Sequence, residues 1–268
     1  MTDTPGRTTA FETVRYDVSD GVATITLDRP EALNSLTIPM KSELLAALKA
    51  ASKDTSVRVI VLTGSGRAFC AGQDLRERLE PDAAPLAVEV RERYNPLIRL
   101  IVDGDRPVIG AINGIAAGAG AALAFACDIR IAADVASFVL GFGRVGLVPD
   151  SGSSWFLPRL IGASKAAELA LTNEPLSAVD AERFGLVAIV VPAAELATAT
   201  RDLALRLAAA APRALALTKR ALRHALETSL EQTLEYEADL QGVAGRTRDH
   251  AEGVAAFLEK RPPRFEGN

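Results

Sequence analysis

The chain has 268 residues, 49% of them hydrophobic, and its formal net charge is −4. A chain of this length and composition can bury a sizeable core, which excludes global disorder and suits one large domain with a small appended region. The acidic balance provides no basic field for a polyanion, so we expect no nucleic-acid partner.

The first third of the chain is predicted to alternate strands and helices. Residues 22–27 (VATITL) alternate and are rich in β-branched side chains, which predicts a strand. A helix over residues 37–52 should follow, because Thr37 can cap it and apolar residues recur at helical spacing. Residues 57–62 are apolar except for Arg58, so they predict a strand covered on both faces.

The middle of the chain continues this alternation. A charged, proline-containing loop over residues 76–85 precedes a predicted helix at 88–102 and a buried strand at 107–112. Small apolar residues at 118–126 predict a tightly packed helix, and residues 129–132 predict another strand.

Helical periodicity dominates from residue 164 onward. Only residues 187–191 interrupt it with a strand-like run, and the tail over 193–258 should be helical with breaks near Pro212 and Gly242. We therefore predict an α/β core over residues 1–190 and a helical C-terminal region over residues 191–268.

The chain carries no recognisable targeting or redox signal. Residues 1–17 contain no apolar segment of signal-peptide length, and Gly, Pro or charge interrupts the later apolar runs, so we expect a cytoplasmic protein without a membrane partner. Cys70 and Cys127 have no metal-ligand spacing and are too few for a disulfide framework. We expect reduced thiols and no metal site.

Two glycine-containing turns are the first candidates for chemistry. Each turn follows a predicted buried strand and precedes the predicted start of a helix; the two turns are residues 69–74 (FCAGQD) and 113–120 (NGIAAGAG). Unpaired backbone N–H groups at a helix start attract negative charge. Brought together, they would form an oxyanion hole that binds an enolate oxygen. The alternative is that these glycines only permit tight turns and close packing.

Several ordered segments resemble the crotonase, or enoyl-CoA hydratase/isomerase, family. The similar segments are AFCAGQDL at 68–75, DRPEALNSL at 28–36, RPVIGAING at 106–114, CDIRIA at 127–132, GLVP at 146–149 and FLEKRPPRF at 257–265. This resemblance implies an α/β fold built as a spiral of strand–strand–helix units. It also implies an acyl-CoA substrate, no separate cofactor because coenzyme A is part of the substrate, and self-association as a homotrimer or hexamer.

The resemblance also implies roles for individual residues. The oxyanion N–H donors fall on Gln73 and Ala119, while Asp74 is expected to tie the first turn together. Further residues are expected to contact the substrate or coenzyme A: Glu31, Ala32, Leu33, Ala71, Asp74, Leu75, Phe142, Val145 and Lys260. Lys260 would lie near the coenzyme A phosphates. Trp155 is expected to belong to the core or, as the alternative, to join Phe142 and Val145 as an apolar wall of the acyl pocket.

Asp150 is the predicted catalytic acid/base. The family's hydratases use two glutamates to activate water, and this chain has Ala122 and Phe142 at those positions. The segment with Asp150 instead resembles the branch of epoxyphenylacetyl-CoA and Δ3,Δ2-enoyl-CoA isomerases, in which an aspartate is the proposed acid/base. From the residues alone, Asp150 would be interpreted as a helix cap or Asx-turn residue.

Other functions remain as alternatives to an isomerase. The chain would be an enoyl-CoA hydratase if another acid serves, or an acyl-CoA binding protein if the chemistry is lost. A dinucleotide fingerprint is disfavoured because Leu123 occupies the place of its last glycine. The family's aryl-CoA dehalogenases also carry this aspartate, but they use a histidine before the second turn, and the first histidine here is His224.

Overall fold

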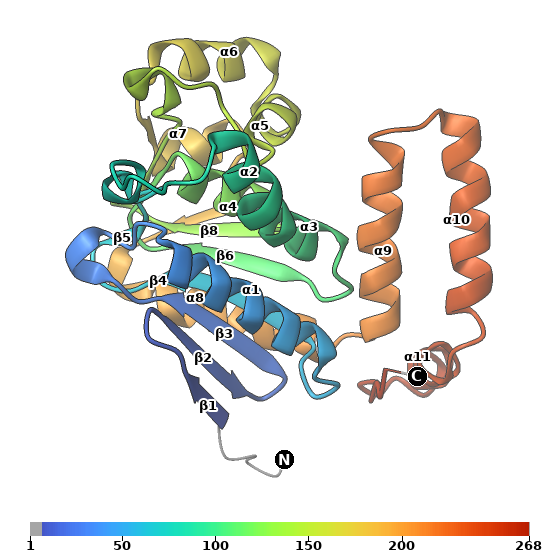
Figure 1. The fold of residues 1–268 in the computed structure, drawn as a ribbon. Coiled ribbons are helices and arrows are strands. Elements are labelled where there is room, and N and C mark those ends of the chain that lie inside the picture. Colours follow the sequence, from blue (N-terminus) through green and yellow to red (C-terminus); the bar gives the residue numbers. More distant parts are fainter. Residues whose placement is uncertain (1–6, 268) are drawn as a thin grey trace.

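A seven-stranded sheet forms the centre of the molecule, in a computed structural model that describes residues 7–267 (Figure 1). The strand order is β1-β2-β3-β4-β6-β8-β11, with antiparallel pairing from β1 to β3 and parallel pairing from β3 onward. The strands are β1 (Arg7–Ala10), β2 (Val14–Ser19), β3 (Val22–Leu27), β4 (Val59–Gly64), β6 (Val108–Ile112), β8 (Ile129–Ala133) and β11 (Ile189–Val191). The strand predicted at 22–27 is confirmed.

Helices cover both faces of this sheet, which explains why its parallel strands are mainly apolar. Side chains alternate along β4, so Ile60 and Leu62 join the core beneath α1 (Ile38–Lys53), and Val59 and Val61 join a second core. That second core is completed by α8 (Leu196–Ala208), which packs against β4, β6 and β8. The predicted cap of α1 is confirmed, since the Thr37 side chain accepts from the Met40 N–H.

A second, smaller sheet lies beside the first and has the order β10-β9-β7-β5. Its strands are β5 (Ala68–Cys70), β7 (Ile115–Ala117), β9 (Ser137–Val139) and β10 (Leu176–Ser177). Each of β4, β6 and β8 is followed by one short strand of this sheet, and β7 leads directly into α4 (Ala119–Ala126). This arrangement confirms the expected spiral of strand–strand–helix units, and it places the two glycine turns at neighbouring strands.

The single helix predicted over 88–102 is wrong in detail. The structure has α2 (Leu86–Glu89), a π-helical turn (Val90–Tyr94) and α3 (Asn95–Asp103). Pro96 is the reason, because it has no N–H to donate within a regular helix. The Asn95 N–H donates instead to the Val90 carbonyl, which is the wider spacing of a π turn.

The remaining helices follow the chain to its C-terminal end. They are α5 (Ser153–Ile161), α6 (Ala163–Thr172), α7 (Ala178–Arg183), α9 (Pro212–Ala225), α10 (Leu230–Ala244) and α11 (Arg248–Glu259), with 3₁₀ turns at Pro30–Ala32, Leu75–Arg78, Phe142–Val145 and Ala193–Glu195. The predicted helix break at Pro212 is confirmed. The break predicted near Gly242 falls after Ala244, and a further break before α10, where Ser229 is the N-cap, was not predicted. No helix within residues 7–267 is long and apolar enough to span a membrane.

The helices α9 and α10 form a hairpin at one side of the core (Figure 1). Ion pairs fasten α9 to the loop before β6 and to the start of β8, among them Lys219 to Asp128 (2.7 Å) and Arg220 to Asp105 (2.5 Å). Large apolar side chains along this hairpin and α11 remain exposed: Leu222, Leu226, Leu230, Leu234, Val254, Phe257 and Leu258. The helical tail therefore presents an apolar surface that this chain does not cover.

Candidate active site

A pocket of about 170 Å³ lies where the two glycine turns meet. Its wall combines both turns with residues of α2, the π-helical turn and the 3₁₀ turn that follows β9. Among the residues predicted for the site, those that line it are Ala71, Gln73, Leu75, Ala119, Phe142, Val145 and Asp150. The pocket thus brings together residues separated by up to 79 positions in the sequence, from Ala71 to Asp150.

The first turn holds the Gln73 N–H toward the pocket. The Leu36 N–H donates to the Gly72 carbonyl (2.7 Å), and the Asp74 N–H donates to the Leu36 carbonyl (3.1 Å). The C=O and N–H of one trans peptide group point in opposite directions, so the Gln73 N–H, which shares its peptide group with the Gly72 carbonyl, points away from Leu36. It has no acceptor among the described residues and remains available to a ligand.

The second turn supplies a matching donor at the start of a helix. Gly118 has φ of 52° and ψ of −124°, a conformation that favours glycine, and α4 begins at the next residue. Ala119 is the first residue of α4, so its N–H has no partner within that helix. This N–H also lies at the positive end of the helix dipole, which favours a developing negative charge.

The two turns are in direct backbone contact, and glycine makes that contact possible. A methyl group on Gly72 would lie 2.7 Å from the Ala117 carbonyl oxygen and 3.4 Å from the Ala119 nitrogen. A methyl group on Gly120 would lie 2.2 Å from the carbonyl oxygen of Cys70, at the end of β5. Both glycines therefore allow the two turns to approach closely, and Gln73 and Ala119 line the same pocket.

Asp150 lines the same pocket and is half-buried. Desolvation raises the pKa of its carboxyl above the ordinary value, against the lowering effect of a hydrogen bond from the Ser151 hydroxyl (2.8 Å). The cap interpretation is wrong, because Gly152 occupies the N-cap of α5 and no side chain caps that helix. The carboxylate is thus free to meet a substrate.

A polar wall opposite the apolar residues was missed by the sequence analysis. Glu89 and Tyr94 line the pocket together with Gln73, and Lys41 of α1 lies behind them. Lys41 and Glu89 form an ion pair, and Glu89 also pairs with Arg93 (2.8 Å). The available signal was a charged residue on the buried face of a predicted helix, since Lys41 lies one turn before Leu44.

Comparison with known proteins identifies the family to which this pocket belongs. The profile of the family described as "Enoyl-CoA hydratase/isomerase" matches residues 17–268. The chain is a member of this enoyl-CoA hydratase/isomerase family. The resemblance inferred from the ordered segments is thereby confirmed.

Relatives named as hydratases and as isomerases are both similar to this chain over almost their whole length. The chain is 46% identical to a "Probable enoyl-CoA hydratase" of Rhodobacter capsulatus and 44% identical to the 1,2-epoxyphenylacetyl-CoA isomerase of Escherichia coli, and each match covers 96% of this chain and 99% of the relative. An enoyl-CoA hydratase structure from Bacillus anthracis superposes with a TM-score of 0.89 at 34% identity, covering 99% of this chain and 100% of that one.

The two positions where the family's hydratases are expected to carry glutamates are apolar in this fold. Ala122 is fully buried within α4, and Phe142 lines the pocket. Two carboxylates line the pocket, and Glu89 is held by two cations. Asp150 makes no ion pair with any described residue, so it is the pocket carboxylate that is open to proton transfer.

The other residues expected from the family support the first turn or lie apart from the pocket. Leu33 accepts from the Ala71 N–H (2.9 Å), at the end of the 3₁₀ turn that contains Glu31 and Ala32; none of the three lines the pocket. Although desolvation raises it, the pKa of Asp74 is lowered overall by hydrogen bonds from Arg76 and Arg29. Those bonds tie the turn together.

Two expected positions differ in the structure. Trp155 does not line the Asp150 pocket; its ring stacks on the Arg159 guanidinium (4.2 Å) in a separate groove, so the alternative of an acyl-pocket wall is wrong. Lys260 is the C-cap residue of α11 with φ of 55°, and it does not line the pocket. Figure 1 shows the α11 helix far from β5.

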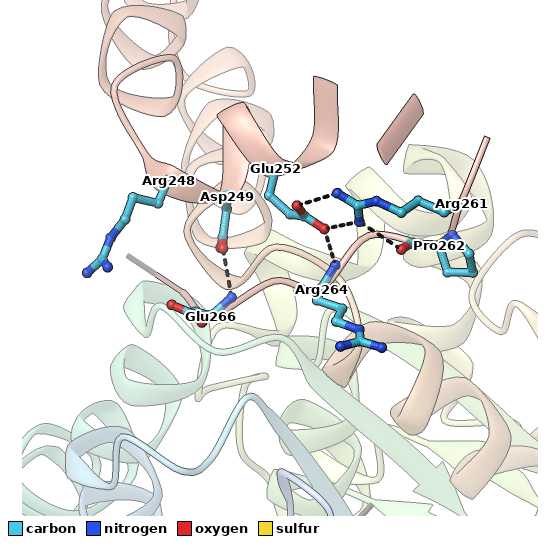
Figure 2. A pocket seen from close by; sticks show the side chains of 7 residues that line it. All are labelled: Arg248, Asp249, Glu252, Arg261, Pro262, Arg264 and Glu266. Atoms are coloured by element: carbon cyan, nitrogen blue, oxygen red, sulfur yellow. Dashed lines mark hydrogen bonds and ion pairs between the residues drawn. The ribbon is translucent and has the colours of Figure 1, made fainter. Parts of the chain in front are cut away.

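A larger cavity of about 620 Å³ is lined by α11 and the C-terminal tail, and hydrogen bonds hold some of its charged groups (Figure 2). Arg261 makes two hydrogen bonds to Glu252 (2.6 and 2.9 Å), which also accepts from the Arg264 N–H (2.8 Å). Asp249 accepts from the Glu266 N–H (2.7 Å). These bonds hold the C-terminal tail against α11.

Proposed function

We propose that the protein is an acyl-CoA isomerase, acting on a double bond or a strained ring through an enolate. The observation that carries the proposal is the pocket's chemistry: two converging backbone donors and one unpaired carboxylate, Asp150, with Ala122 and Phe142 where two glutamates would serve hydration. The similarity to the 1,2-epoxyphenylacetyl-CoA isomerase of Escherichia coli supports it.

In the proposed mechanism, one carboxylate moves one proton. The thioester oxygen accepts from the Gln73 and Ala119 N–H groups, a stabilisation typically worth about 3–4 kcal/mol per donor. Asp150 removes a proton from Cα, and the electrons pass to the thioester oxygen as an enolate. The same carboxylic acid then returns the proton to Cγ, so the reaction needs no second acid and no cofactor beyond the substrate's own coenzyme A.

The apolar wall suits this reaction because it limits water at the intermediate. Phe142 is almost fully buried, and Leu140 and Val90 complete the wall near Asp150. Excluding water strengthens the electrostatic interactions of the enolate and keeps Asp150 protonated long enough to return the proton.

The direct experiment supplies a 3-enoyl-CoA and follows formation of the conjugated 2-enoyl-CoA. We expect turnover of this substrate and hydration of crotonyl-CoA below about 10 s⁻¹, the median for enzymes, because two general acid/base groups worth about 10²–10⁴-fold each are missing. Crotonyl-CoA hydration at or above that rate, without isomerisation, would favour the alternative hydratase, which the Rhodobacter capsulatus relative supports. Binding of both thioesters without turnover would indicate an acyl-CoA binding protein.

The pH dependence should report the environment of Asp150. Its basic form is lost as the pH falls through a pKa that desolvation has raised. We therefore expect kcat/KM for the 3-enoyl-CoA to fall in acid at a higher pH than an ordinary aspartate would give. A profile that stays flat down to the ordinary aspartate range would contradict this expectation.

We also propose that the protein self-associates, as a trimer or a pair of trimers. The exposed leucines of α9 and α10 and the exposed Phe257 form an apolar surface that a second copy would cover. In such an assembly, Lys260 would lie near the coenzyme A phosphates of a neighbouring subunit. Sedimentation velocity should give an oligomer at micromolar concentration, and a stable monomer there would exclude this arrangement.

A further inference from the structure

A buried ion pair stands directly behind the first oxyanion turn. The Lys41 side chain is 1% exposed and Glu89 is 4% exposed. Lys41 reaches from α1 to a residue 48 positions away, at the end of α2. Burying two charges costs hydration energy that their attraction does not reliably offset, so stability alone is a weak explanation for such a pair.

The ion pair is linked to Gln73 by hydrogen bonds that leave its side-chain amide no freedom. The Gln73 Oε1 accepts from the Lys41 Nζ (3.0 Å) and from the Tyr94 hydroxyl. The Gln73 Nε2 donates to the Asp74 carbonyl (3.2 Å) and to a Glu77 carboxylate oxygen (3.2 Å). Both lone pairs and both protons of this amide are therefore used.

The same residue supplies a backbone N–H to the pocket. Leu36 fixes the peptide groups on both sides of Gln73, and the network fixes its side chain. With backbone and side chain both held, the N–H cannot rotate away from the thioester oxygen. Electrostatic stabilisation of a transition state depends on donors that are already oriented when charge develops.

We propose that Lys41, held by Glu89, is a positioning residue that orients the Gln73 N–H of the oxyanion hole. This rests on the proposed function, because it assigns Gln73 to the thioester oxygen. Lys41 does not line the pocket, so it acts through Gln73 and not on the substrate. Glu89 does line it, but Lys41 and Arg93 hold its two oxygens, so it serves as an anchor and not as a second acid.

The neighbouring groups support a fixed network and not a proton relay. Desolvation raises the pKa of the Tyr94 hydroxyl, which therefore stays protonated and donates to Gln73. The Lys41 ammonium also lies 4.9 Å from the centre of the Tyr94 ring, which adds a cation–π contact to the same cluster. All of these contacts converge on Gln73.

The experiment compares the parent enzyme with Lys41→Met, with Gln73→Leu and with two double variants, Lys41→Met/Glu89→Gln and Lys41→Met/Gln73→Leu. Lys41→Met alone leaves the buried Glu89 carboxylate with Arg93 as its remaining cation. Adding Glu89→Gln removes that negative charge, and the glutamine carbonyl can still accept from Arg93. Lys165→Met is the matched control, because it removes a surface ion pair to Glu168 (2.7 Å) outside the site. Melting temperature, kcat and KM for the 3-enoyl-CoA are measured for each.

A second readout monitors the oxyanion hole without any turnover. A bound 3-oxoacyl-CoA such as acetoacetyl-CoA ionises to an enolate with its own near-ultraviolet absorbance, so its pKa on the enzyme reports stabilisation of the thioester oxygen. We expect the parent to lower this pKa and Lys41→Met to reverse the shift by at least about one unit, matching a fall in kcat of about 10–100-fold with KM within about threefold. Lys41→Met/Gln73→Leu should be no worse than either single variant.

The variant that removes both charges of the ion pair, Lys41→Met/Glu89→Gln, separates an effect on positioning from an effect on stability. We expect Lys41→Met/Glu89→Gln to melt within a few degrees of the parent yet to retain the low kcat and the raised enolate pKa. If it regains the parent's kcat and enolate pKa, or if Lys41→Met never alters them, the ion pair is structural and the proposal is overturned. A parent that lowers the enolate pKa but does not isomerise would overturn the proposed function and leave this inference standing.

Discussion

Asp150→Asn is expected to lower kcat for 3-enoyl-CoA isomerisation by about 10²–10⁴-fold, the usual contribution of a general acid/base. Asparagine has nearly the same shape, but it cannot accept the Cα proton. The Ser151 hydroxyl can still donate to the asparagine carbonyl oxygen, so the local hydrogen bond survives. Because only the proton-transfer step is changed, kcat and kcat/KM should fall together while KM stays similar.

The stability of this variant provides its control. A carboxyl whose pKa is raised in the folded state favours folding when protonated, and that contribution is lost as the pH rises through the folded pKa. At neutral pH, burial of the Asp150 charge therefore opposes folding, and Asp150→Asn should melt at the same temperature or higher. If the variant folds, binds acyl-CoA and retains kcat within about tenfold of the parent, Asp150 is not the catalytic acid/base.

The parts of the fold that were predicted are those in which one segment carries its own signal. The strand at 22–27 alternates β-branched residues, and Thr37 supplies a cap that its own helix uses. The three-residue strands β5, β7 and β9 are too short to show a period, and they exist because they pair with each other. The small sheet was therefore expected only from the family resemblance.

The site shows the same division between local and long-range signals. The two turns could be predicted from their glycines and ordered motifs, because a backbone donor needs a particular local geometry. Lys41 carries a local signal, as a charged residue on the buried face of its helix, but nothing local shows which residues it meets. Lys41 and Tyr94 reach Gln73 from 32 and 21 positions away, and Glu89 is linked to Gln73 through Lys41. The desolvation of Asp150 likewise depends on what packs around it.

The π-helical turn illustrates how one residue type affects the site at a distance. Pro96 prevents a regular helix, and the resulting turn at 90–94 adds one residue to the helical repeat. Glu89 immediately precedes this turn and Tyr94 is its last residue, and both line the pocket. Irregular helical turns of this kind often occur at functional sites, because they re-aim side chains that a regular helix would direct elsewhere.

Gly120→Ala is expected to have the second large effect, on stability and activity together. The new methyl group would lie 2.2 Å from the Cys70 carbonyl oxygen and 2.7 Å from the Cys70 Cβ, neither of which can rotate away. Relief requires α4 to move from β5, which should cost about 2–4 kcal/mol of stability. The same movement separates Ala119 from Gln73, so kcat should fall by about 100-fold even in the molecules that fold.

Gly242→Ala is the matched control for this substitution. Gly242 also lies inside a helix, but a methyl group there would have only the end of the Arg246 side chain within contact distance, at 3.7 Å. Because alanine favours a helix over glycine by about 1 kcal/mol, Gly242→Ala should raise the melting temperature and leave kcat unchanged. Equal melting temperatures for the two variants, or a Gly120→Ala enzyme with the parent's kcat and enolate pKa, would mean that the two turns do not need the close contact seen at Cys70.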